Sequence, residues 1–260
     1  MPTIQGMGIE TTLPQLTLLP RGLFTQVVPQ IDLTQEGADR TAFGAKYMTR
    51  GALAPHVDDF GCDTDDETTD EVTLDEREQL PFVFWDSMTC STVAIEPDYL
   101  LDWLNADKNL TLSAALTLAA TTQITADHLN LADDSTTVTA STGVTAGIGN
   151  IEAGLAGVIG NAKGYIFVSP TLIAPAVAAG AVLVRDNRFE SPRGHDVIAD
   201  AGHGAENTIY GTGSMAWSVV DDSFGDPLQF SRAQNRYRAE FRRYGLVLLN
   251  PAHSVKTVVS

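Results

Sequence analysis

The side chains with the clearest potential for acid–base or metal chemistry lie between residues 195 and 203. His195, Asp200 and His203 are close together in the sequence, and Gly202 and Gly204 flank the second histidine. Because His195 and Asp200 are an odd number of positions apart in a predicted strand, their side chains point to opposite faces and cannot easily share a metal ion. A glycine-rich loop is the preferred interpretation, and an α/β enzyme with a site near His195–His203 stays an alternative.

Three further patterns lack a part that their chemistry requires. Cys62 and Cys90 provide two thiols, which alone do not complete a tetrahedral zinc site. Residues 63–67 lack the central glycine and the later glutamate of a calcium loop. The glycines of residues 147–154 have the wrong spacing for a dinucleotide-binding turn. The sequence therefore predicts no catalytic residue, no metal site and no cofactor.

The strongest charge anomaly is an acidic block between Asp58 and Glu78. The chain has 33 acidic and 16 basic residues, a formal net charge of −17, and Arg77 is the only cation in this block. Such a segment repels itself, so it must be solvated, meet cations or face a basic partner. The candidate contact residues are Asp58, Asp59, Asp63, Asp65, Asp66, Glu67, Asp70 and Glu71.

Length and composition narrow the class of protein. With 260 residues and 43% hydrophobic content, the chain can form a sizeable core in one or two domains. Its acidity argues against tight contact with nucleic-acid phosphates, which needs clustered Lys and Arg. The first residues lack the features of a signal peptide, and the apolar run 172–184 is too short and too interrupted to cross a bilayer. We therefore expect a cytoplasmic protein without membrane contact.

Periodicity predicts an α+β fold in which helices pack on a sheet. Strands are expected at 80–93, 164–168 and 195–199, and the alternation in residues 209–259 indicates long strands. Helices are expected from residue 96, from 144 to 159 with one buried stripe, and from 170 to 180 with Ser169 as the cap. Residues 1–30 carry four prolines among apolar residues, which indicates an arm that lies on another surface.

Several short motifs follow one another along the chain. They are Pro81–Phe84, Cys90-Ser91, Ile148–Gly160, Tyr165–Pro170, the turn Tyr210–Gly213, and Asn235–Glu240 followed by an apolar strand. In this order, over roughly residues 20 to 259, the chain resembles the major capsid proteins of tailed bacteriophages, especially those of actinobacterial hosts. Encapsulin shell proteins share the same topology.

The resemblance implies an α+β tailed-phage major capsid fold. It implies an N-terminal arm at 1–48, an extended acidic loop at 49–80, a peripheral domain with a spine helix at 81–134 and 221–260, and an axial domain at 135–220. The chain would form hexamers and pentamers of an icosahedral virion capsid around double-stranded DNA, assembled in the host cytoplasm. Further expected partners are scaffold, portal and decoration proteins, with weak non-specific contact with DNA. An encapsulin-like cargo compartment is the alternative shell.

A cluster of arginines is the natural counterpart of the acidic block. Glu240 is the only acid between Arg232 and Arg243. In the resembled fold, the extended loop reaches over the peripheral domain of an adjacent subunit, where this segment would lie. The arginines are therefore expected to pair either with the acidic block of a neighbour or with carboxylates of their own subunit. The candidate contact residues are Arg232, Arg236, Arg238, Arg242 and Arg243.

Overall fold

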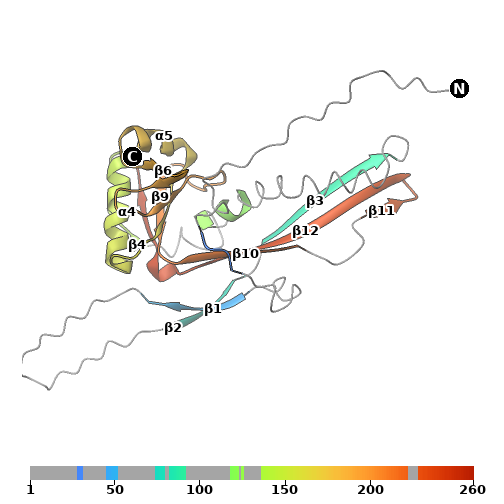
Figure 1. Ribbon diagram of the computed structural model, residues 1–260, viewed down its shortest axis with the longest axis horizontal. Coiled ribbons are helices and arrows are strands. Elements are labelled where there is room, and N and C mark those ends of the chain that lie inside the picture. Colours follow the sequence, from blue (N-terminus) through green and yellow to red (C-terminus); the bar gives the residue numbers. More distant parts are fainter. Residues whose placement is uncertain are drawn as a thin grey trace, which may run out of the picture.

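The fold is seen in a computed structural model, which describes residues 28–31, 45–51, 74–79, 82–91, 118–122, 124–125, 136–221 and 228–260 (Figure 1). The candidate acids from Asp58 to Glu71 and the helix expected from residue 96 lie outside these ranges, as do residues 1–27 of the expected arm. None of the described helices is long and apolar enough to span a membrane.

The largest sheet has seven strands in the order β4-β13-β9-β5-β8-β7-β6. It is a mixed sheet, because β5 runs parallel to β8 and antiparallel to β9. Its strands are β4 (Thr136–Thr137), β5 (Tyr165–Phe167), β6 (Leu183–Arg185), β7 (Arg188–Glu190), β8 (Asp196–Ile198), β9 (Thr208–Thr212) and β13 (Val255–Val258). The strands expected at 164–168 and 195–199 are confirmed as β5 and β8.

Helix α4 (Val144–Ile159) packs on β9 and β13 through the stripe that its sequence predicts. Ile151 and Leu155, in this stripe, are both 0% exposed. A Cβ on Gly147 or Gly154 would come within 2.8 Å of a valine side chain, so the small residues permit close packing against the sheet. The glycine-containing run at 147–154 is therefore part of a packed helix and forms no nucleotide-binding turn.

Helix α5 (Pro170–Ala178) begins where the sequence predicts. Ser169 Oγ accepts a hydrogen bond from the backbone N–H of Thr171 (3.3 Å), and Pro170 lies in the first turn. Both features favour a helix start, because proline needs no N–H partner there and serine satisfies one of the unpaired backbone donors.

A second, four-stranded sheet is built around β12 (Arg236–Leu249). β3 (Phe82–Ser91) pairs along one edge of β12, and β10 (Met215–Asp221) and β11 (Leu228–Ser231) pair along the other. The strand expected at 80–93 is thereby confirmed. Figure 1 shows that the turn between β11 and β12 lies at the opposite end of the molecule from α4 and α5.

Strand pairing crosses the domain ranges expected from the sequence. β10 falls almost entirely in the range 135–220 but pairs with β12, whereas β13 falls in the range 221–260 but pairs with β9. The short helix η4 (Pro251–His253) connects β12 to β13 and thus one sheet to the other. The domain boundaries themselves stay a prediction.

Two hydrophobic cores meet at β5. Ile166 and Phe167 are neighbours in sequence, are both 0% exposed, and belong to different cores because successive strand residues point to opposite faces. Ile166 lies in the core that contains Leu155 of α4. Phe167 lies in the core that contains Met215 and Leu249, at the ends of β10 and β12. Phe167 therefore joins the seven-stranded sheet to the second sheet.

Residues 28–31 lie against β10 and are held by Trp217. The indole Nε1–H donates to the carbonyl of Val28 (2.9 Å), and the backbone N–H of Trp217 donates to the carbonyl of Pro29 (3.1 Å). The carbonyl of Trp217 accepts from the backbone N–H of Ile31 (2.8 Å). The described part of the expected arm thus lies on its own subunit at this point.

Strands β1 (Ala45–Arg50) and β2 (Leu74–Gln79) form a separate antiparallel ribbon. The hydroxyl of Tyr47 donates to the carbonyl of Leu249 (2.9 Å), and His253 Nε2 lies 3.2 Å from the carbonyl oxygen of Gly51. These contacts fasten the ribbon to the end of β12 and to η4. In the sequence, the acidic block begins between β1 and β2 and continues into β2.

Gly202 fixes the contact between the turn at 202–204 and the helical residues 118–122. Its φ is +91°, and a Cβ there would lie 2.5 Å from the carbonyl oxygen of Leu118. We expect Gly202→Ala to lower the free energy of unfolding by roughly 1–3 kcal/mol, because it adds backbone strain and this clash. Gly157→Ala is the matched control, since its Cβ would meet nothing within 4 Å and it lies in α4. Equal thermal midpoints for the two variants would contradict this expectation.

Candidate functional site

The candidate arginines lie along one end of the second sheet. Arg232 lies in the turn between β11 and β12, Arg236 begins β12, and both are exposed. Arg238 is also exposed, whereas Arg243 is half-buried. Arg242 belongs to β12 by its backbone, opposite Trp85 of β3. The cluster is therefore carried mainly by a long paired strand.

The alternation of β12 divides these arginines between two faces. Arg236 and Arg238 are two residues apart and share a face, whereas Arg243 is an odd number of residues away and points to the other face. β12 pairs with β3 without interruption from Arg236 to Gly245, so no bulge resets the alternation. Grouping the arginines by proximity in the sequence had missed this division.

An aromatic pair lies beside the exposed arginines. The ring centroids of Phe230 and Tyr237 are 5.0 Å apart at an interplanar angle of 45°, a favourable geometry for aromatic contact. Phe230 nevertheless stays 46% exposed. We call Phe230, Arg232, Arg236 and Tyr237 the β11–β12 tip. It combines an exposed aromatic ring with two cations, of which Arg236 points to the face opposite Tyr237, and residues 228–238 contain no acid.

A pocket of about 500 Å³ opens between β1, the ends of β10 and β12, and the turn after α4. Its apolar lining includes Met48, Ile159, Met215 and Leu248, and Ser214 is among the polar groups. Its volume falls in the range of pockets that bury a drug-sized group. The pocket is therefore large enough to receive an aromatic side chain with part of its strand.

The ribbon beside this pocket carries exposed acids. Asp75, Glu76 and Glu78 of β2 are all exposed, and β2 pairs with the β1 residues that line the pocket. Lys46 Nζ lies 3.6 Å from Glu76 Oε1, but both side chains are 65% exposed, so this pair contributes little to stability. Contact between the acids from Asp58 to Glu71 and the arginines stays a prediction.

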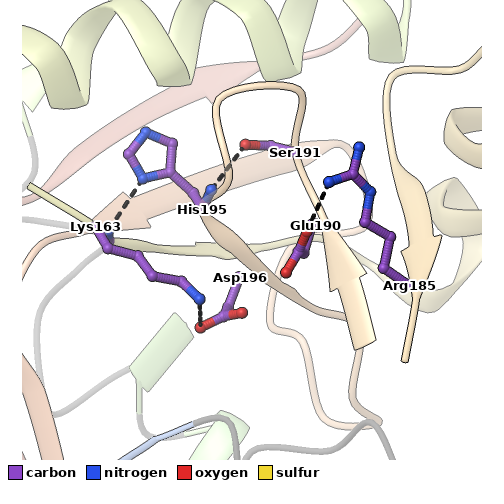
Figure 2. A network of polar contacts seen from close by, with 7 residues as sticks. Lys163, Arg185, Glu190, Ser191, His195 and Asp196 are labelled. Carbon is purple, nitrogen blue, oxygen red and sulfur yellow. Dashed lines mark hydrogen bonds and ion pairs between the residues drawn. The ribbon is translucent and has the colours of Figure 1, made fainter. Parts of the chain in front are cut away.

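His195 and Asp196 fasten the start of β8 to the start of β5 (Figure 2). His195 Nδ1 accepts a hydrogen bond from the backbone N–H of Gly164 (3.0 Å), and Asp196 Oδ2 pairs with Lys163 Nζ (2.9 Å). The backbone N–H of His195 donates to Ser191 Oγ (3.2 Å), and the histidine is only 5% exposed. This arrangement is a structural clamp, because the Nδ1 lone pair that a catalytic base would use is already occupied.

The clamp predicts a loss of stability in acid. Burial lowers the pKa of His195 below its ordinary value of 6.5, and the nearby Glu152 opposes this shift only in part. A histidine with a lowered folded-state pKa contributes stability above the unfolded-state pKa, and that contribution is lost as the pH falls through the folded-state pKa. We therefore expect Tm to fall as the pH drops below about 6.5. His195→Asn keeps an acceptor for Gly164 without titrating, so its Tm should fall less. An identical decrease of Tm with pH in the unmodified protein and in His195→Asn would contradict this role of His195.

His203 is likewise part of the fold. Its ring centroid lies 5.5 Å from that of Tyr210, and burial lowers its pKa. Asp200 is only 7% exposed. Residues 195–203 therefore form a strand and a turn, which agrees with the expected strand at 195–199 and the glycine-rich loop after it. Within the described ranges, no three His, Cys, Asp or Glu side chains are placed to hold a metal ion.

Several solved structures match nearly the whole chain. An encapsulin complex from Synechococcus elongatus matches with a TM-score of 0.59 at 10% identity, over 96% of this chain and 91% of that one. The mature capsid of bacteriophage PhiM1 matches with a TM-score of 0.52 at 11% identity, over 98% and 92% of the two chains. A chain of Mycobacterium phage Che8 matches with a TM-score of 0.53 at 12% identity, over 99% and 96%. This chain has the capsid fold. No protein-family model and no curated protein sequence matches it.

The capsid fold confirms the resemblance found in the sequence. The expected α+β class is confirmed, with the large mixed sheet at its centre. At identities of 10–12%, the similarity establishes the fold alone. The arm, the extended loop and the spine helix stay predictions. The α/β enzyme alternative gains no support from these neighbours, two of which are a capsid and an encapsulin.

The sequence interpretation missed both the pocket and the exposed aromatic ring. A usable signal for the ring was Asn235, because asparagine is common in turns. In the structure its φ of +48° helps close the turn between β11 and β12. A turn predicted there would have placed Phe230 opposite Tyr237. The pocket had no such signal, because its walls come from segments that are distant in the sequence.

Proposed function

We propose that this chain is the major capsid protein of a tailed bacteriophage. It self-assembles into the hexamers and pentamers of an icosahedral head that encloses double-stranded DNA. The observation that carries the proposal is the similarity to the PhiM1 mature capsid over 98% of this chain and 92% of that one. The virion is assembled in the host cytoplasm, with scaffold, portal and decoration proteins as further partners.

In this proposal, each part of the capsid fold corresponds to a range of residues in this chain. Residues 1–48 form the N-terminal arm, and residues 49–80 form the extended loop. Residues 81–134, with the spine helix, and 221–260 form the peripheral domain, and residues 135–220 form the axial domain. The separation of the β1–β2 ribbon from the two larger sheets supports the extended loop, because a two-stranded ribbon gains stability from a neighbour.

The proposed subunit contact pairs the arginines with the acidic block of a neighbour. Its support is the exposure of Arg232 and Arg236 on an otherwise acidic chain. A single exposed ion pair contributes only about 0 to 1 kcal/mol, so the contact depends on several pairs at each interface and on repetition around the shell. Salt should weaken it, because the charges involved are exposed to solvent.

A cargo compartment of the encapsulin type is the second candidate. The specific observation in its favour is the TM-score of 0.59 to the encapsulin complex, against 0.52 to the PhiM1 capsid. The two candidates differ in the content of the particle. Particles purified from the cells that naturally produce them should hold double-stranded DNA if the chain is a capsid protein, and protein cargo if it is a compartment shell.

Sedimentation of the purified full chain tests the shell function itself. A shell protein should form species far larger than the 27.8 kDa subunit, and their fraction should rise with protein concentration. Discrete capsomers or closed particles would support the proposal. A single 27.8 kDa species at all concentrations and salt conditions, with or without a crowding agent, would contradict it.

Contact with the packaged genome should be weak. Neutralising phosphates requires clustered cations, and the chain has only 16 Lys and Arg against 33 Asp and Glu. We expect isolated subunits to bind duplex DNA with a Kd above about 1 μM at physiological salt, without preference for sequence. Fluorescence anisotropy over a salt series measures this. Sub-micromolar binding that resists salt would contradict the expectation.

A further inference from the structure

We propose that the β11–β12 tip of one subunit inserts Phe230 into the pocket beside β1 of a neighbouring subunit. The inference rests on the proposed shell function and identifies one contact between neighbouring subunits of the shell. The partner is a second copy of this chain.

The inserting side chain is exposed and supported. Phe230 packs on Tyr237 but keeps 46% of its surface in contact with solvent. Large apolar side chains that project beside arginines are typical anchors of protein interfaces, because the ring fills a pocket while the guanidinium groups bind the rim. Arg232 lies in the turn two residues beyond Phe230, whereas Arg236 alternates with Tyr237 and points to the opposite face of the sheet.

The receiving surface is a pocket of about 500 Å³ whose lining is mainly apolar but also includes Lys163, Asn250 and His253. One wall comes from β1, where Met48 is 57% exposed. The opposite walls come from Met215 of β10, Leu248 of β12 and Ile159 of α4. Burial of Phe230 between these side chains would remove apolar surface from water on both subunits, which is the main favourable term in association.

Charge favours this pairing of tip and pocket. The tip segment 228–238 has three arginines and no acid. Residues 45–79, which include both strands of the ribbon and the segment that connects them, have eleven Asp and Glu against three Lys and Arg. Strands β1 and β2 themselves are balanced, with three acids and three bases, so the negative charge that would steer the basic tip belongs to the segment that connects them in the sequence.

The tip and the pocket of one subunit cannot meet. In Figure 1 the turn between β11 and β12 lies at one end of the long axis, whereas β1 and β10 lie nearer the middle of the molecule. Contact between two different patches of the same chain is heterologous, so each subunit can receive one neighbour and insert into another. Such contacts repeat into rings or extended arrays, as a shell requires.

Chemical cross-linking tests the contact directly. Phe230→Cys and Met48→Cys are combined in a Cys62→Ser/Cys90→Ser background, and assembled particles are treated with a short thiol-specific cross-linker. We expect a ladder of covalent oligomers on a denaturing gel. The matched control replaces Met48→Cys by Val184→Cys, which is 48% exposed on β6 and does not line the pocket. The control pair should give no ladder.

The outcomes separate this contact from the shell function. If the background variant forms particles but the Phe230–Met48 pair gives no more oligomer than the control pair, the contact is wrong and the shell function stands. Cross-linking by Phe230→Cys alone would indicate a contact between tips and would also overturn the inference. If the full chain with its native cysteines forms no particles, the proposed function fails and this contact fails with it.

Variants that block either side give a second test. Ala162 is exposed at the pocket, so Ala162→Trp should fill part of it without disturbing the core. We expect Ala162→Trp and Phe230→Ala each to lower particle yield roughly tenfold with Tm unchanged, and Phe230→Tyr to keep most of the yield. Normal yield for Ala162→Trp and Phe230→Ala would contradict the contact. Normal yield combined with weaker DNA binding by Phe230→Ala would assign the tip to nucleic acid instead.

Discussion

Replacing Arg232 and Arg236 by glutamate in one variant is expected to abolish particle formation while leaving the subunit folded. Both side chains are exposed, so their loss removes no core packing. In the proposed contact, each change turns an attraction to the acidic block into a repulsion, and the change is repeated at every interface. Although one exposed pair contributes only about 0 to 1 kcal/mol, several repulsions per subunit should prevent a closed shell. Particle yield by sedimentation and Tm by circular dichroism measure the two parts of this expectation.

A compensating variant separates a specific contact from a general effect of charge. Asp65→Lys and Asp66→Lys, added to the double arginine variant, should restore part of the particle yield, because opposite charges again face each other. The deficit of the double arginine variant should also shrink in high salt, which screens exposed charges. Particles at the yield of the unmodified chain, in both low and high salt, would show that these arginines do not form the contact.

Phe167→Ala is expected to cause the largest loss of subunit stability. Phe167 is 0% exposed in the core that joins β5 to the ends of β10 and β12. Removal of a buried phenylalanine ring typically costs about 3–5 kcal/mol, because it loses transfer free energy and leaves a cavity. That loss is a large part of the roughly 5–15 kcal/mol by which a typical domain is stable. Denaturant unfolding followed by tryptophan fluorescence measures it.

Val184→Ala is the control for this variant. Val184 is also apolar and lies in the same sheet, but it is 48% exposed in the edge strand β6. Its replacement should change the free energy of unfolding by about 0.5 kcal/mol or less. A similar small loss for Phe167→Ala would mean that the two sheets are not joined through a shared core.

The sequence predicted the elements that depend on local pattern. The stripe of α4, the Ser169 cap of α5 and the strand at β3 each follow from the spacing of a few residues, and all three are confirmed. The strand at 195–199 is confirmed for the same reason. The turn at 201–204 agrees with the glycine-rich loop expected there, because glycines around His203 favour a turn.

Features that depend on pairing between distant segments could not be predicted from the sequence. The return of β13 to the seven-stranded sheet depends on its register with β9, which no local pattern encodes. The division of the arginines between two faces required the uninterrupted pairing of β12 with β3. The pocket required the docking of β1 beside the end of β12, which Tyr47 secures through a hydrogen bond to a residue far away in sequence.

Electron microscopy of the purified full chain tests the central claim most directly. The proposal predicts closed icosahedral particles, or tubes and capsomers built from the same subunit contacts, and class averages of capsomers should show sixfold and fivefold symmetry. At a resolution that traces the chain, the same images would show whether Phe230 of one subunit reaches the pocket of the next. Isolated subunits without any symmetric assembly, under conditions that keep the chain folded, would contradict the assignment as a shell protein.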